Sequence, residues 1–369
     1  MTTVIAFLVV FIPIVLLHEL GHFITAKLSG VKVIEFGIGL PPRIWSFKRG
    51  ETTYALNAIP LGGYNKMLGE EDPSDPRSLA AKPAWKRAIV LSAGAGMNAV
   101  LALVLFASFF MIPQTQVVGN VVVDQVAADS PAARAGIQPG DIVRKVNGAT
   151  IENSGDLRYQ YQLRLGANAS TVVERNGQPV KVSVTPRWKP PAGQGFTGIR
   201  VRLDAPSVVP PNAKAIPGVP DGPVEVRRHA SFFPAIKRGG VNMYESLVLM
   251  KNGIQSWFIG SSSPSSDALG PIGIARVTGD AASRSVADVV FLAALISLNL
   301  AIFNILPFPA LDGGRLFFLA IEVARRGKRI PPQKEALVHL AGFAILLVLI
   351  VAISFNDIGR LLQGKSPYG

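Results

Sequence analysis

The chain has 369 residues, of which 49% are hydrophobic and 17% are charged, and its mean hydropathy is positive. This composition excludes an ordinary water-soluble protein of this length. Cysteine is absent, which excludes disulfides and thiolate chemistry. The formal net charge of +13 would suit nucleic-acid binding, but many of the basic residues gather in short loops between apolar runs, which argues against that partner.

Four long apolar runs account for the hydrophobic excess. A helix needs about 20 apolar residues to cross the core of a bilayer, and each run is close to that length. A buried core helix would explain one such run but not four. We therefore predict four transmembrane helices, at residues 4–28, 88–112, 289–311 and 336–355.

The first run leads directly into the sequence LLHELGHF, residues 16–23. A signal peptide carries positive charge before its apolar run and a small-residue cleavage site after it. Residues 1–23 have neither feature, so we interpret this run as a membrane helix.

The loops between the runs predict the orientation. Residues 27–87 contain ten Lys or Arg against six acidic residues, and residues 313–334 contain six against one. Short basic loops mark the cytoplasmic side of a membrane, whereas long translocated domains escape this rule. We therefore expect both loops to be cytoplasmic and the N-terminus, the long middle region and the C-terminus to lie outside.

The first loop contains the stretches KVIEFGIGLPPRIWSF and TTYALNAIPLGGYNKM, in which glycines permit tight turns and prolines interrupt pairing. They predict a small β-hairpin or sheet at the cytoplasmic face, associated with the membrane.

The middle region begins with a compact, mostly β domain. Ser130 and Pro131 predict the start of a short helix, and Gly136 predicts its left-handed end. Two Asn-Gly pairs predict hairpin turns. Residues 189–226, rich in Pro and Gly, indicate a linker or irregular cover, and residues 231–258 show helical spacing of apolar residues. This helix would lie on the outer membrane surface or pack on its own protein.

The sequence HELGH contains the pattern H-E-x-x-H. Residues four apart lie on one face of a helix, so His18 and His22 can share one zinc ion while Glu19 acts as the general base. A surface helix is the alternative in a soluble protein. At mid-bilayer, however, each ionisable group costs about 2.5–3.5 kcal/mol, so such a cluster needs a partner.

Catalytic zinc takes three protein ligands and keeps a fourth position open. Asp312 is the favoured third ligand, because the first and third runs cross in the same direction and Pro307 and Pro309 break the helix before it. The alternative is that Asp312 merely ends a membrane helix. His339, near the cytoplasmic end of the fourth run, is a weaker candidate that we expect to be a packed or interfacial residue.

These motifs resemble the site-2 protease family of intramembrane zinc metalloproteases, most closely its bacterial regulator-of-sigma-E-protease (RseP) type. The likeness follows the chain in order, through HELGH, FGIG, IPLGGYNKM, GAGMN, SPAARAGIQPGDIV, GPIGIA and SLNLAIFNILPFPALDGG. The resemblance implies a polytopic α-helical membrane protein with four transmembrane helices, a cytoplasmic-side membrane-associated β-hairpin or sheet, and one exterior PDZ-like α+β domain.

The resemblance also implies a division of the chain and roles for its residues. Residues 1–116 would hold the first two helices and the β region, 117–188 the PDZ-like domain, 189–284 the linker and exterior helix, and 285–369 the last two helices. One Zn²⁺ would be bound by His18, His22 and Asp312, with Glu19 as catalytic base. Asn299 and Asn304 would hold the substrate backbone, for which helix–helix hydrogen bonding is the alternative.

The implied activity is regulated intramembrane proteolysis in the bacterial cytoplasmic (inner) membrane. The substrates would be single-span membrane proteins such as trimmed anti-sigma factors, or signal-peptide remnants, with membrane lipid as surroundings and no nucleic acid. The exterior domain would exclude bulky substrates or capture a newly cut chain end. Two departures from the family pattern stand out: Ala95 replaces a proline, and Asn65 replaces an apolar residue.

Two other classes of function fit parts of the sequence. A non-catalytic membrane scaffold would use the exterior domain to gather partners, but the intact Glu19 argues against it. A transporter or channel would distribute its charged residues over several helices, whereas here they gather near one point.

Overall fold

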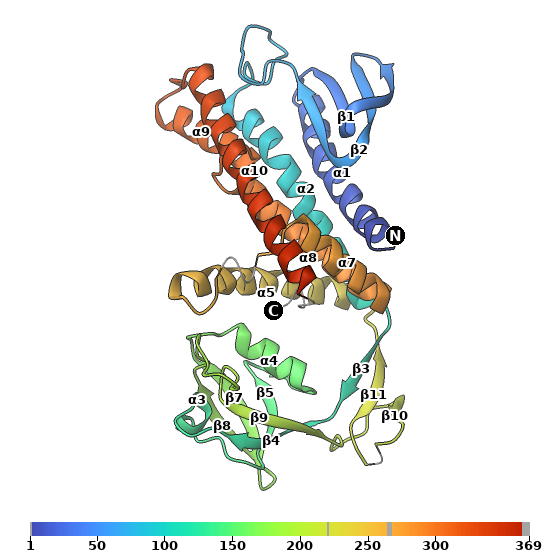
Figure 1. Cartoon of the computed structure of the whole chain (residues 1–369), viewed down its shortest axis with the longest axis vertical. Coiled ribbons are helices and arrows are strands. Elements are labelled where there is room, and N and C mark those ends of the chain that lie inside the picture. Colours follow the sequence, from blue (N-terminus) through green and yellow to red (C-terminus); the bar gives the residue numbers. More distant parts are fainter. Residues whose placement is uncertain (1, 220, 264–267, 364–369) are drawn as a thin grey trace. The chain divides into compact units, whose positions relative to one another are not determined.

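The computed structural model describes residues 2–219, 221–263 and 268–363 (Figure 1). The chain forms two compact units. The first combines Met1–Phe109, Ile236–Met243 and Asp267–Gly369, and the second combines Phe110–Ala235 and Tyr244–Ser266.

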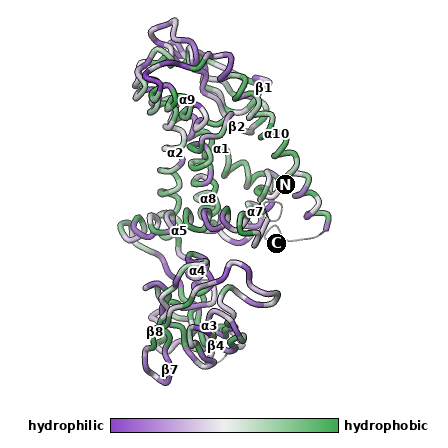
Figure 2. Tube along the Cα trace, turned by 90° about the vertical axis from the view of Figure 1, so that its left-hand side faces the viewer, coloured by the Kyte–Doolittle hydropathy of each residue, from purple (hydrophilic) through white to green (hydrophobic). Residues whose placement is uncertain are grey.

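Four helices in the described part of the chain are long and apolar enough to cross a membrane, which confirms the predicted number. Hydrophobic residues run along each of them (Figure 2). They are α1 (Thr2–Leu28), α2 (Ala84–Met111), α8 (Val286–Ile305) and α10 (Pro332–Leu362). Two shorter helices of the first unit, α7 (Pro271–Arg284) and α9 (Asp312–Ala324), have 14 and 13 residues.

The third of these helices is shorter than the predicted run. We expected it to reach residue 311, but α8 ends at Ile305 because Leu306 takes an extended conformation, with ψ 145°. Pro307 and Pro309 follow and cannot continue a helix. The new helix α9 begins at Asp312. The proline break before Asp312 is thus confirmed, and it occupies residues 306–311.

Strands β1 (Val33–Arg49) and β2 (Thr52–Met67) confirm the predicted hairpin. Their register is unusual, since Phe36 pairs with both Tyr54 and Asn65. Residues 35–38 of β1 therefore lie between two parts of β2, residues 53–56 and residues 63–66. Residues 63–67 of β2 are called the outer segment below. β2 also packs beside α1.

Helices α1 and α2 cross at small residues. A Cβ atom on Gly21 would lie only 2.6 Å from the carbonyl oxygen of Ala93, so a larger residue would push the helices apart. Close backbone approach through small residues is the usual way that membrane helices pack. Closer to the start of α1, Val10 and Ile14 are buried together with Ala293 of α8.

The second unit contains a β-sheet with the strand order β8-β7-β5-β4-β9 and with β6 paired to β5. Its elements are β4 (Asn120–Val126), α3 (Pro131–Arg134), β5 (Ile142–Val146), β6 (Ala149–Thr150), α4 (Ser154–Gln162), β7 (Ala169–Arg175), β8 (Gln178–Val184) and β9 (Ile199–Asp204).

The structure confirms the helix start and the turns predicted for this unit. The side chain of Ser130 accepts a hydrogen bond from the Ala133 N–H and caps α3, and Gly136 has a φ of 77°. Asn147-Gly148 and Asn176-Gly177 all have positive φ, as the favoured two-residue hairpin turns require. A core that includes Val121, Val143 and Val173 closes the domain.

The predicted linker was wrong in one respect, because it contains strands. β9 lies within residues 189–226 and completes the sheet by pairing with β4. A second sheet joins β10 (Ala213–Ala215), β11 (Val224–Arg228) and β3 (Gln114–Val118). These short strands alternate with Pro and Gly, which hid them in the sequence. The helix expected at residues 231–258 is confirmed as α5 (Phe232–Ile259).

The carboxylate of Asp141 stabilises the large sheet. It is 1% exposed and accepts two hydrogen bonds of 2.7 Å from Arg175 and one of 2.9 Å from the Gln138 N–H. Burial alone would raise the pKa of Asp141, but these hydrogen bonds outweigh it and lower the pKa. Its contribution is therefore present above the unfolded pKa of about 3.9 and is lost as the pH falls through the lower folded value.

We predict that Asp141→Asn destabilises this unit by about 2 kcal/mol at pH 7, because a charged acceptor is lost. Hydrogen exchange of β5 and β7 in the intact protein measures the effect. The difference between variant and wild type should shrink as the pH approaches 3, and a constant difference between pH 7 and pH 3 would contradict this account.

Candidate metal centre and active site

Helix α1 places two imidazoles and a carboxylate at the point where it crosses α2. The rings of His18 and His22 lie edge to face, with centroids 4.8 Å apart. Glu19 lies beside the outer segment of β2, where a Cβ atom on Gly63 would lie 2.9 Å from Glu19 Cγ. The absence of a side chain at position 63 therefore lets β2 pass next to the glutamate.

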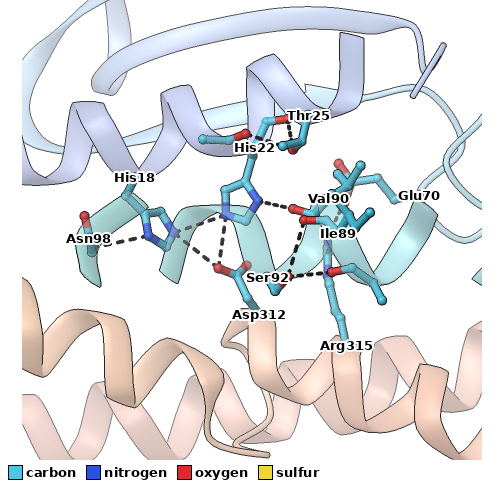
Figure 3. A network of polar contacts seen from close by, with 12 residues as sticks. His18, His22, Thr25, Glu70, Ile89, Val90, Ser92, Asn98, Asp312 and Arg315 are labelled. Carbon is cyan, nitrogen blue, oxygen red and sulfur yellow. Dashed lines mark hydrogen bonds and ion pairs between the residues drawn. The ribbon is translucent and has the colours of Figure 1, made fainter. Parts of the chain in front are cut away.

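Asp312 joins this pair from the other end of the chain (Figure 3). Its Oδ2 atom lies 3.2 Å from His18 Nε2 and 3.1 Å from His22 Nε2, and the two nitrogens are 3.2 Å apart. Among the described residues, these three form the one group of His, Cys, Asp or Glu side chains that could hold a metal ion. The alternative ligand, His339, is not part of it.

The hydrogen-bonding partners of His22 fit a metal ligand. Its Nδ1 lies 2.7 Å from the Val90 carbonyl oxygen, which can only accept, so Nδ1 carries the proton and Nε2 holds a lone pair. This lone pair faces the carboxylate oxygen of Asp312. Either a proton on Nε2 or a metal ion between the two atoms makes this contact favourable, and a metal ion would let both imidazoles and the carboxylate bind at one point.

The distances also fit zinc. With zinc–ligand distances of about 2.0–2.1 Å, two ligands of a tetrahedral ion stand about 3.3 Å apart. The three distances between His18, His22 and Asp312 are 3.1–3.2 Å. The donor set therefore fits a zinc ion with three protein ligands.

Asn98 of α2 is a site residue that sequence reasoning missed. Its Nδ2 lies 3.4 Å from His18 Nδ1, and its Oδ1 has no partner among the described residues. With the Asn98 side-chain amide flipped, Oδ1 accepts a hydrogen bond from His18 Nδ1–H, and Nε2 of His18 is then free to bind a metal. Ser297 holds the backbone here by donating to the Asn98 carbonyl oxygen at 2.8 Å. The GAGMN motif was the available signal.

A cavity of about 780 Å³ opens onto the cluster. Asn65 and His339 contribute to its wall together with the three proposed ligands and Glu19. Both side-chain atoms of the Asn65 amide are buried without a hydrogen-bond partner in the described part of the chain. The unusual asparagine noted in the sequence thus lies at the site.

The two predicted substrate-binding asparagines lie elsewhere on α8. Asn299 is exposed and Asn304 is half-buried, and neither is part of the cavity wall around the cluster. Their roles stay predictions.

Comparison with known proteins identifies the family. The profile described as peptidase family M50 matches residues 6–349. The chain belongs to peptidase family M50. The family match and the relatives named zinc metalloproteases show that it is a zinc metallopeptidase, which confirms the predicted enzyme class and cofactor.

Three relatives extend over nearly the whole chain. A Clostridium perfringens protein, named as a candidate zinc metalloprotease, is 35% identical over 353 residues, covering 95% of this chain and 97% of that protein. Zinc metalloprotease RasP of Geobacillus kaustophilus is 29% identical over 441 residues, covering 97% and 98%. RasP of Shouchella clausii is 26% identical over 448 residues, covering 98% and 100%.

The geometry predicts a specific role for Gly94 of α2. A Cβ atom there would overlap His22 Nε2 and would lie 2.6 Å from His18 Nε2. We predict that Gly94→Ala displaces both imidazoles and weakens zinc binding about tenfold or more, measured by competition with a chelator.

The matched control is Gly96→Ala on the same helix, where nothing lies within 4 Å of the added atom. Both variants make the same change in helix propensity. Equal zinc affinity in the two variants would show that α2 does not confine the histidines.

Proposed function

We propose that this protein is an intramembrane zinc metalloprotease that cuts single-span membrane proteins within or near their transmembrane segments. The observation that carries the proposal is the position of the ligands. His18 and His22 lie on α1, a helix long and apolar enough to cross a membrane, and Asp312 meets them there. Ionisable groups at such a position are costly and indicate function.

The proposed chemistry assigns one role to each residue. His18, His22 and Asp312 hold the zinc ion, which when bound acts as a Lewis acid that activates water and polarises a peptide carbonyl. Glu19, next to His18 in sequence, takes a proton from the attacking water. The same carboxyl group then delivers the proton to the leaving amine.

The substrate helix must unwind before its peptide bonds can react, because its carbonyl groups are engaged in helical hydrogen bonds. The outer segment of β2, residues 63–67, can pair with the opened strand, which satisfies the freed backbone groups. The unpartnered Asn65 amide and Gly63 beside Glu19 support this path. Asn299 and Asn304 are proposed to hold the substrate further along.

The remaining assignments belong to the same proposal. The sheet unit, residues 117–188 extended by β9, is proposed to be a PDZ-like domain on the exterior side. Its cavity of about 410 Å³ lies against α4 and β9 and could receive a strand or chain end, although size exclusion needs no binding motif. The β1/β2 region and the active site would face the cytoplasm of a bacterial inner membrane. Trimmed anti-sigma factors and signal-peptide remnants are the proposed substrates.

We predict that Glu19→Gln abolishes cleavage but leaves the zinc ion in place. Removal of a general base costs about 10²–10⁴-fold in rate, whereas the three ligands are unchanged. Zinc per chain in detergent and cleavage of a single-span substrate are measured for both proteins.

His22→Ala is the second variant, and it should lose both zinc and cleavage. Cleavage by Glu19→Gln at the wild-type rate would exclude Glu19 as the base. An absence of zinc from the folded wild-type protein would exclude the mechanism and favour the scaffold.

A further inference from the structure

The segment between α8 and α9 delivers Asp312 to the site in an unfavourable backbone conformation. Ala310, two residues before Asp312, has a φ of 76°. L-residues other than Gly, Asn and Asp rarely adopt this left-handed region, and holding one there costs on the order of 1–3 kcal/mol. Something outside the segment must therefore hold it.

The holding group comes from α10. The Ala310 N–H donates a hydrogen bond of 3.0 Å to Nδ1 of His339. A backbone N–H can only donate, so Nδ1 must be unprotonated, and the neutral ring carries its proton on Nε2. The nearest carboxylate oxygen, on Glu335, lies 4.0 Å from Nε2, too far for a hydrogen bond.

Two glycines allow α10 to approach this segment. A Cβ atom on Gly342, one turn after His339, would lie 2.8 Å from the Pro309 carbonyl oxygen. A Cβ atom on Gly314 would lie 3.1 Å from Cε1 of His339. The ring also lies beside Phe318 of α9, with centroids 5.5 Å apart. The imidazole is therefore inserted between α10, α9 and the segment.

We propose that His339 is a positioning residue of the metal site, which fixes Ala310 in its left-handed conformation and thereby aims Asp312 at the two histidines. The proposal rests on the proposed role of Asp312 as a ligand. It also explains why a histidine that does not bind the metal lies in the wall of the active-site cavity.

Three substitutions separate hydrogen bonding from packing. In His339→Asn the amide oxygen takes nearly the place of Nδ1 and can accept from Ala310. In His339→Gln the amide lies nearer the place of Nε2, and His339→Leu offers no acceptor. We expect the Leu and Gln variants to bind zinc about 10–100-fold more weakly and the Asn variant to stay within about threefold of the wild type.

Ala310→Gly provides an independent control, because glycine adopts a positive φ without strain. In this background His339→Leu should weaken zinc binding much less than in the wild type, so the two changes should not be additive. Equal loss in both backgrounds would contradict a role in holding Ala310.

A second readout does not depend on the metal. Amide exchange of residues 306–314, measured in the zinc-free protein, should be faster in His339→Leu than in the wild type or His339→Asn. If His339→Leu matches the wild type in exchange and zinc affinity, the proposal is wrong. If the wild type binds no zinc, the proposed function fails, while the exchange comparison still tests His339.

Discussion

Three electron-rich atoms that face one another at 3.1–3.2 Å are the constraint on which the rest of the structure depends. Two imidazole nitrogens and a carboxylate oxygen share this space only if protons or a metal ion lie between them, because their lone pairs would otherwise face one another. A zinc ion held there, as proposed, would add to the stability of the bundle as well as supply its chemistry. Removal of any one of the three side chains would leave the other two partly buried with one charged or polar partner fewer.

The neighbouring backbone is adapted to this cluster by residues without side chains. Gly94 gives the two imidazoles room against α2, Gly63 lets β2 pass beside Glu19, and Gly314 leaves space for the ring of His339. Each glycine lies on a different element, so three elements approach the site closely at once. A larger residue at any of these positions would separate an element from the metal centre rather than only alter its local packing.

The sequence was informative where one local pattern determines the outcome. The four-residue spacing of His18 and His22 fixes a shared helix face. The two closely spaced prolines before Asp312 favour a helix end more strongly than the single Pro13, which lies inside α1. It was uninformative where a residue acts through a contact distant in sequence. Asn98, Gly94 and His339 owe their roles to neighbours far along the chain, and β9 is recognisable as a strand only by its pairing with β4.

The buried amide of Asn65 is unfavourable without a substrate and would become favourable once the proposed substrate pairs with it. A buried amide without a partner costs about 1–3 kcal/mol, and both polar atoms of this one are unpaired in the cavity wall. An unwound substrate carries the complementary deficit, because its freed N–H and C=O groups have no water to bind in the membrane. If they meet in this cavity, as proposed, hydrogen bonds between them would offset both costs. The protein would thus favour an opened backbone over an intact helix, whose groups are already paired.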